Sequence, residues 1–127
     1  MNNFFIKLFN SFKYAFAGIK IILKGNNFKI MLCFEIFLLI LGAFFKITLN
    51  DLLIVLVLMG ILFTLEAVNT LLEKLMDFFE ADYSKRVKDI KDISAAAVLI
   101  FSFFTVLCEL IIYLKYFIKI ILPLFVR

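Results

Sequence analysis

The 127-residue sequence contains no histidine, and this absence excludes a large part of enzyme chemistry. Serine–histidine triads, imidazole metal sites and histidine phosphotransfer all need that side chain. The two cysteines, Cys33 and Cys108, lie in separate apolar segments, so neither a disulfide nor a zinc site is indicated. Any chemistry of this chain therefore rests on carboxylates, lysines and a metal ion.

Proline and glycine are also scarce, with one and four copies, and the chain has no glycine- or serine-rich linker and no internal repeat. This scarcity predicts a single domain over residues 1–127. The net charge is +4, but the basic residues flank apolar segments and form no separate basic face. Nucleic acid is therefore not expected as a partner, whereas anionic lipid headgroups and nucleotide phosphates are.

Apolar residues dominate what is present. They make up 65% of the chain, against roughly 45–50% in soluble domains. Three long apolar stretches approach the ~20 residues that a helix needs to cross a membrane. The expected fold is an all-α integral membrane protein with spans at about 29–46, 52–79 and 93–115, because backbone groups inside lipid must be paired within helices.

The basic residues indicate how these spans are oriented. Ten of the fourteen lie before the first span, at the end of the second, or in the connection 80–92. The positive-inside rule places the N-terminus and this connection in the cytoplasm. Residues 4–24 alternate apolar and lysine positions at helical spacing, which predicts an amphipathic helix lying in the membrane interface.

A polar stripe on the second span is the most informative segment. Four side chains recur at spacings of three and four and so share one helix face: Glu66, Asn69, Glu73 and Asp77. A carboxylate such as Glu66 among apolar neighbours costs at least ~2.5 kcal/mol, which makes it a candidate general base; structural hydrogen bonding between helices is the alternative. Glu73 and Asp77, nearer to water, are candidate Mg²⁺ ligands beside a phosphate site.

The third span opens with Lys91 and Asp92, followed by small residues at 94–97 that let helices approach closely. This end is expected to pack against the stripe, so that Lys91 can neutralise phosphate charge. The chain has no glycine-rich phosphate loop, so spacing alone is a weak indication of a kinase.

These motifs resemble a known family, the bacterial integral-membrane diacylglycerol kinases and the related undecaprenol kinases. Residues 66–77 are similar to the family's E-x-x-N-[ST]-x-x-E-x-x-x-D motif, residues 82–83 to its acidic-Tyr pair, and residues 91–98 to its K-D-x-x-[AS]-A-A-V motif. Residues 11–20 resemble its amphipathic N-terminal helix. The resemblance covers nearly the whole chain.

The resemblance implies a lipid kinase of the bacterial inner membrane that moves the γ-phosphate of ATP to the hydroxyl of diacylglycerol. It implies a homotrimer with active sites between subunits. Glu66 would take the hydroxyl proton, Asn69 would orient groups between the substrates and Glu73 would bind Mg²⁺. The residues that would hold ATP are Lys7, Tyr14, Asp82, Tyr83, Lys91 and Asp92.

One departure from the family concerns the segment before the first span. The family normally carries a second metal-binding glutamate there, where this chain reads Lys24-Gly-Asn-Asn-Phe28, and no carboxylate occurs before Glu35. Asn26 is the candidate neutral replacement. Two other functions stay open on the sequence: undecaprenol as the acceptor, and a membrane scaffold without catalysis. Glu35 and Glu109 are polar residues within spans with no assigned role.

Overall fold

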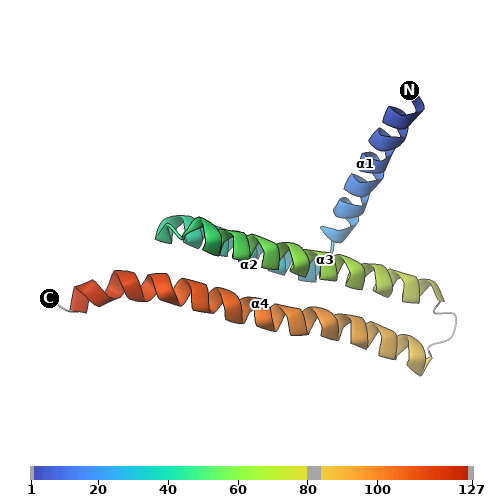
Figure 1. The fold of residues 1–127 in the computed structure, drawn as a ribbon. Coiled ribbons are helices and arrows are strands. Elements are labelled where there is room, and N and C mark those ends of the chain that lie inside the picture. Colours follow the sequence, from blue (N-terminus) through green and yellow to red (C-terminus); the bar gives the residue numbers. More distant parts are fainter. Residues whose placement is uncertain (1, 80–83, 126–127) are drawn as a thin grey trace.

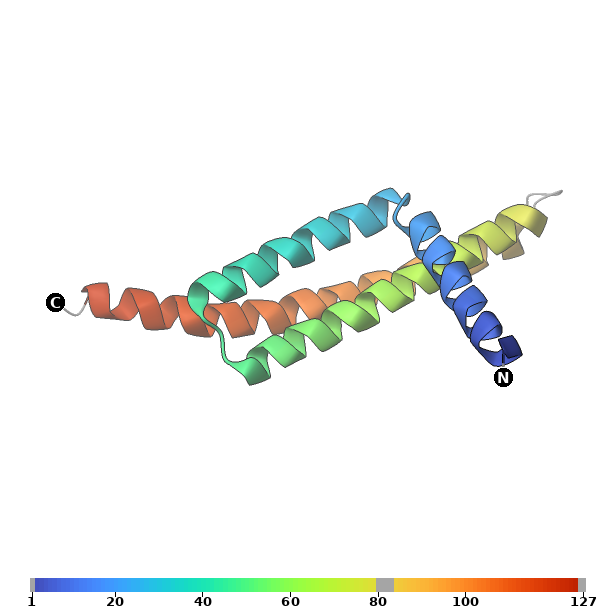
Figure 2. The same ribbon diagram turned by 90° about the horizontal axis from the view of Figure 1, so that it is seen from above.

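Four helices and no strand make up the part of the chain that the structure, a computed structural model, describes: residues 2–79 and 84–125. The helices are α1 (Asn2–Ile22), α2 (Asn26–Phe45), α3 (Leu49–Phe79) and α4 (Lys85–Phe125). Helices α2, α3 and α4 lie alongside one another, and α1 leaves this bundle at a steep angle (Figure 1). The turned view in Figure 2 shows the same arrangement. The predicted all-α fold is confirmed.

Three of the helices are long and apolar enough to cross a membrane: Asn26–Phe45, Leu49–Phe78 and Lys85–Ile120. Large apolar side chains cover their outer faces, and Phe44 and Leu99, for example, are more than two-thirds exposed. Such exposure suits a chain whose solvent is lipid, because lipid tails are as apolar as these side chains. The protein is a multi-pass membrane protein, as the apolar stretches predicted.

Helix α4 is longer than the span predicted at 93–115, because the charged segment 85–92 is helical and does not belong to the connection. Ser84 begins this helix, since its backbone and side-chain oxygens both accept from the Val87 N–H, at 3.0 and 3.3 Å. Lysine, arginine and aspartate are hydrophilic, yet lysine and arginine are good helix formers. Hydropathy locates the apolar part of a helix, so it placed this boundary wrongly.

The turn between α2 and α3 defines what we call the hairpin end of the bundle. Lys46 closes α2 in the left-handed conformation, with φ 51° and ψ 51°. The N–H groups of Lys46 and Ile47 donate to the carbonyls of Ala43 (3.3 Å) and Gly42 (3.1 Å), which is a Schellman motif. A Cβ on Gly42 would lie 2.9 Å from Ile47 Cδ1 and 3.0 Å from the Tyr113 hydroxyl. Glycine at position 42 thus lets the turn and α4 approach α2.

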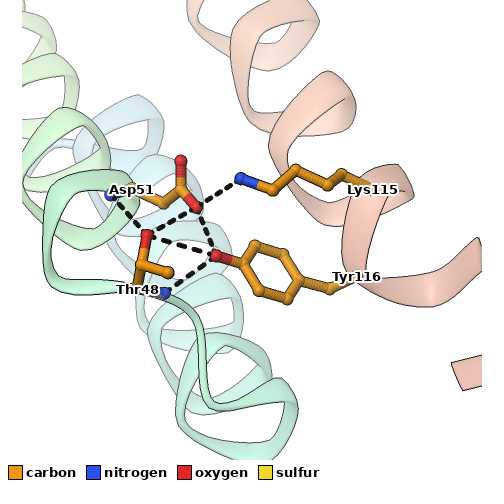
Figure 3. Close-up of polar contacts among 4 residues, drawn as sticks. All are labelled: Thr48, Asp51, Lys115 and Tyr116. Atoms are coloured by element: carbon orange, nitrogen blue, oxygen red, sulfur yellow. Dashed lines mark hydrogen bonds and ion pairs between the residues drawn. The ribbon is translucent and has the colours of Figure 1, made fainter. Parts of the chain in front are cut away.

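Polar contacts then join the turn to α4 (Figure 3). The Thr48 hydroxyl donates to Asp51 Oδ2 (2.8 Å) and accepts from the Asp51 N–H (3.4 Å), which caps the start of α3. The Tyr116 hydroxyl accepts from the Thr48 N–H at 2.8 Å and donates to Asp51. Lys115 adds an ion pair to Asp51 at 2.9 Å. Beneath these contacts lies the buried apolar core, formed by Leu38, Val55, Ile112, Tyr113 and Tyr116.

Tyr116→Phe should destabilise the bundle. The substitution removes the acceptor of the Thr48 N–H and the hydroxyl donor to Asp51, in a place where Tyr116 is 7% exposed. A buried group left without its partner costs about 1–3 kcal/mol. Lys115→Met is the matched control, because its side chain is 61% exposed and exposed ion pairs add little to stability. Unfolding in detergent micelles with increasing dodecyl sulfate measures both; equal losses would contradict this assignment.

Candidate functional site: a polar cavity where α1, α2 and α3 meet

The polar stripe of α3 lies on the face that packs against α4, which is the most extensive helix contact in the molecule. Glu66 is 4% exposed and Asn69 is 3% exposed, whereas Glu73 and Asp77, further along the same face, are exposed. Polar side chains inside a membrane bundle need partners from other helices, because lipid offers none. The side chains of the stripe are therefore buried at Glu66 and Asn69 and exposed at Asp77.

A chain of hydrogen bonds fixes the middle of the stripe. The Ser94 hydroxyl of α4 donates to Asn69 Oδ1 at 2.6 Å, and Asn69 Nδ2 donates to Glu73 Oε1 at 3.2 Å. Asn69 can do both because its side chain carries one acceptor and one donor group. The orientation of the Glu73 carboxylate is thus set from the neighbouring helix.

An ion pair fixes the exposed end of the stripe. Lys91 Nζ of α4 lies 2.7 Å from Asp77 Oδ1, with the two side chains 28% and 61% exposed. A pair this exposed contributes little to stability, about 0–1 kcal/mol. Its importance is positional, because it places a cation from α4 beside the acidic residues of α3.

A cavity of about 590 Å³ opens where the end of α1, the start of α2 and the stripe come together. Three carboxylates and two ammonium groups line it, together with backbone and amide groups of the α1–α2 turn. Its lining residues are Ile21, Lys24, Gly25, Asn26, Asn27, Glu66, Thr70, Glu73, Lys74 and Asp77. Mixed charge around one cavity suits a ligand that carries both phosphate groups and a metal ion.

A second, smaller cavity of about 220 Å³ lies between α2, α3 and α4. Half of its lining residues are apolar, namely Met31, Ala95, Val98 and Leu99, and half are polar, namely Asn27, Glu66, Asn69 and Ser102. Glu66 is the one ionisable group among them, so this cavity is much less charged than the first. Asn27 and Glu66 line both cavities. The buried Glu66 carboxyl is therefore a boundary between a charged cavity and a much less charged one, where it can exchange a proton with a group held in either.

The structure brings together only part of the residue set that the sequence predicted. Glu66, Asn69, Glu73 and Lys91 belong to the stripe and its α4 partners. Within this single chain, the lining of the large cavity includes neither Lys7 nor Tyr14, which lie on the protruding α1, nor Asp92, which is exposed on α4. Asp82 and Tyr83 lie outside the described residues.

Several polar residues at the site were missed as site residues from the sequence. Lys24, Asn27, Thr70 and Lys74 line the large cavity, and Ser94 holds Asn69. Thr70 and Lys74 directly follow Asn69 and Glu73 in the sequence, so their proximity to the stripe was a usable indication. Lys24 and Asn27 lie in the segment where the resembled family carries a metal-binding glutamate, which was the indication for them, but only the fold of the α1–α2 turn brings them to α3.

Gly25 lies in this cavity at the point where the sequence departs from the resembled family. Its backbone is extended, with φ −64° and ψ 134°, a conformation open to any residue. A Cβ there would lie 3.2 Å from the Ile22 carbonyl oxygen and 4.0 Å from Phe28 Cβ, so a side chain requires the backbone at Ile22 to move by a few tenths of an ångström. The backbone dihedral angles at position 25 therefore do not require glycine. The fold by itself does not exclude a carboxylate there.

The fold and the cavities define a class: a multi-pass helical membrane protein with a charged cavity and a buried carboxyl at the boundary of a second, much less charged one. A family model described as Prokaryotic diacylglycerol kinase matches residues 13–113. The chain belongs to this family and is a lipid kinase of the diacylglycerol or undecaprenol kinase type. No curated protein and no solved structure matches the chain. The family resemblance stated from the motifs is confirmed.

Ser94→Ala tests the hydrogen-bond chain at the site. The substitution leaves the buried Asn69 Oδ1 without its donor, so we expect a loss of about 1–3 kcal/mol in stability. Ser102→Ala is the matched control on the same helix, because its hydroxyl donates only to the Val98 carbonyl of its own helix, at 2.8 Å. Micelle unfolding again gives the comparison, and a loss no larger than that of Ser102→Ala would refute the role of Ser94.

Proposed function

We propose that this protein transfers the γ-phosphate of ATP to the hydroxyl of diacylglycerol, giving phosphatidic acid. The observation that carries the proposal is the position of Glu66, which lines both cavities and is 4% exposed. A lipid alcohol fits the less charged cavity, and a nucleotide phosphate fits the charged one. Family membership supports the lipid kinase reaction in general, and the choice of ATP and diacylglycerol is ours.

In the proposed reaction, the lipid hydroxyl oxygen attacks the γ-phosphorus and the bond from that phosphorus to the β-phosphate oxygen breaks, so that ADP leaves. Glu66 accepts the hydroxyl proton, the role of a general base. Lys24 and Lys74 line the cavity that would hold the phosphates, and Lys91 lies beside it on Asp77. Their charges stabilise the negative charge of the phosphoryl group in transit, which is the main task in phosphoryl transfer.

We expect Mg²⁺ to arrive with the nucleotide. The described residues include no group of three acidic, histidine or cysteine side chains that could hold a metal ion by themselves. Mg²⁺ commonly takes one or two carboxylates and completes its shell with phosphate oxygens and water. Glu73 would hold the ion, because it lines the cavity and accepts only one hydrogen bond, from Asn69 to Oε1, so its carboxylate keeps capacity for a metal. The bound ion would neutralise phosphate charge.

Undecaprenol is the alternative acceptor. The smaller cavity combines apolar walls with one carboxyl, two amides and a hydroxyl, which suit the hydroxyl end of any long-chain alcohol, so its chemistry favours neither lipid. A scaffold without catalysis is the second alternative, and the absence of a carboxylate at Gly25 is the observation that favours it.

We place the active protein in the bacterial inner membrane as a homotrimer, with its N-terminus and the connection 80–92 in the cytoplasm. The distribution of basic residues supports this orientation. Lys7, Tyr14 and Asp92, which do not line the cavity of their own chain, would then complete the nucleotide site of a neighbouring subunit, together with Asp82 and Tyr83. The protruding α1 is suited to such an exchange (Figure 2).

Glu66→Gln should reduce phosphate transfer about 10²- to 10⁴-fold, because glutamine keeps the shape of the side chain but cannot accept the proton. Purified protein in mixed micelles, with γ-labelled ATP, Mg²⁺ and either diacylglycerol or undecaprenol, measures the rate with each acceptor. Asp89→Asn is the control, since Asp89 is exposed on α4 away from both cavities. Unchanged transfer by Glu66→Gln would remove this residue as base, and no Mg²⁺-dependent transfer by wild type to either lipid would favour a scaffold.

Gly25→Glu should increase activity by more than about tenfold, or ~1.4 kcal/mol, because it adds a carboxylate to the lining that already holds Glu73. The Mg²⁺ concentration for half-maximal activity should fall as well. Gly25→Gln is the matched control, with equal size and no charge. If the two variants behave alike, the native site is not short of a metal ligand.

A further inference from the structure

Three buried polar side chains lie in the bundle away from the cavities: Glu35 of α2 and Thr105 and Glu109 of α4. They are 1%, 1% and 2% exposed, so they are among the most buried side chains of the described residues. Phe28 of α2 packs against Phe63 of α3 with ring centroids 5.0 Å apart, which aligns these two helices. Counting from that pair at 1.5 Å per residue, Glu35 lies roughly 15 Å from Glu66 along the bundle, toward the hairpin end.

The carboxyl groups of Glu35 and Glu109 are adjacent, within hydrogen-bonding reach of each other. Nevertheless, Glu35 Oε2, both carboxyl oxygens of Glu109 and the Thr105 hydroxyl oxygen have no hydrogen-bond partner. Two ionised carboxylates cannot bond to each other, because each only accepts. The neighbouring Tyr113 hydroxyl already donates to the Leu38 carbonyl at 2.6 Å. Among the described residues, the unpartnered Thr105 hydroxyl carries a single proton and can serve at most one of these three carboxyl oxygens, so the pair is still short of a hydrogen-bond donor.

The repulsion between the two negative charges also indicates that the pair is missing a proton. Two adjacent carboxylates repel each other and cannot both stay ionised in a site from which water is excluded. Tyr113 is the other titratable group that faces them from α4, and α3 contributes the apolar Val55 to the same end of the bundle. No lysine or arginine of the described residues acts on the pair, so its charge has no compensating cation. A proton supplies both missing elements at once, since it removes a negative charge and turns one acceptor into a donor.

We propose that Glu35 and Glu109 form a proton-binding site inside the membrane bundle. A carboxylic acid on one side donates its O–H to a carboxyl oxygen of the other, and so joins α2 to α4. Thr105 lies one turn before Glu109 on the same face of α4, where its hydroxyl can donate to the remaining Glu109 oxygen. The proton is taken up from solution when the bundle forms and is returned when it separates. The pair takes no part in the chemistry of phosphate transfer.

The pair has a mechanical consequence because α2 contacts the other two helices far less than α3 and α4 contact each other. The observed ties between α2 and α4 are the bond from Tyr113 to the Leu38 carbonyl and apolar packing around Leu38 and Phe45, while the adjoining turn is held through Tyr116. The proposed bond between Glu35 and Glu109 would add a second polar tie. The start of α2 supplies Asn26 and Asn27 to the large cavity. The proton therefore helps to hold the helix that carries one wall of the site.

Infrared spectroscopy of the full-length protein in micelles tests this site. Wild type at neutral pH should show the C=O stretching band of a protonated carboxylic acid, shifted on transfer to D₂O, and Glu35→Gln/Glu109→Gln should lose it. Asp89→Asn, which removes an exposed carboxylate, should keep it. Since the native bundle binds more protons than the unfolded chain, wild-type stability should fall as pH rises, and the double glutamine variant should lack this part of the decline.

Three results would overturn the proposal: no such band in wild type, a band of equal size in the double variant, or stability that depends on sodium or potassium and not on pH. The last would make the resident ion an alkali cation. If the glutamine pair does not assemble, Glu35→Met/Glu109→Met serves instead, because replacing a buried polar pair with apolar residues of similar size often preserves stability. It too must lose the band and the pH-dependent decline.

Discussion

The requirement that polar groups inside lipid find their partners within the protein governs this molecule. Most of the surface of α2, α3 and α4 is apolar and exposed, so apolar burial alone does little to select how the three helices face one another. The polar side chains make that selection. The bond from Ser94 to Asn69 and the ion pair from Lys91 to Asp77 set α4 against α3 in one rotational position. The same contacts create one side of the candidate site.

The two ends of the bundle are built differently. At the hairpin end, Gly42 allows a close approach, the Thr48–Asp51 cap begins α3, and Tyr116 ties both to α4. At the opposite end α1 turns away from the bundle (Figure 2). A cavity of about 590 Å³ lies between the end of α1, the start of α2 and α3. Rigid contacts at one end and a cavity at the other suit an enzyme whose helices must keep their positions while two substrates of different polarity bind.

Glu66 and the pair of Glu35 and Glu109 show two ways in which one bundle can keep carboxyl groups in an apolar environment. Glu66 lies beside an amide and lines two cavities, so it has access to a ligand and to a proton acceptor or donor. The pair is enclosed and lines neither of those cavities, so its partners must come from within the pair. The difference in access, rather than in residue type, separates a candidate catalytic group from a structural one.

Much of this protein was determined by its sequence alone. The spans, the polar face of α3 and the approach of Lys91 to it all follow from spacing, because helical periodicity and the membrane constrain where side chains point. The sequence motifs also indicated the family to which the chain belongs. Tertiary structure decided the rest. Lys24 and Asn27 reach α3 only through the α1–α2 turn, and Glu35 meets Glu109 from a position 74 residues away in the sequence. No local pattern encodes such meetings, because they depend on how helices rotate and tilt against one another.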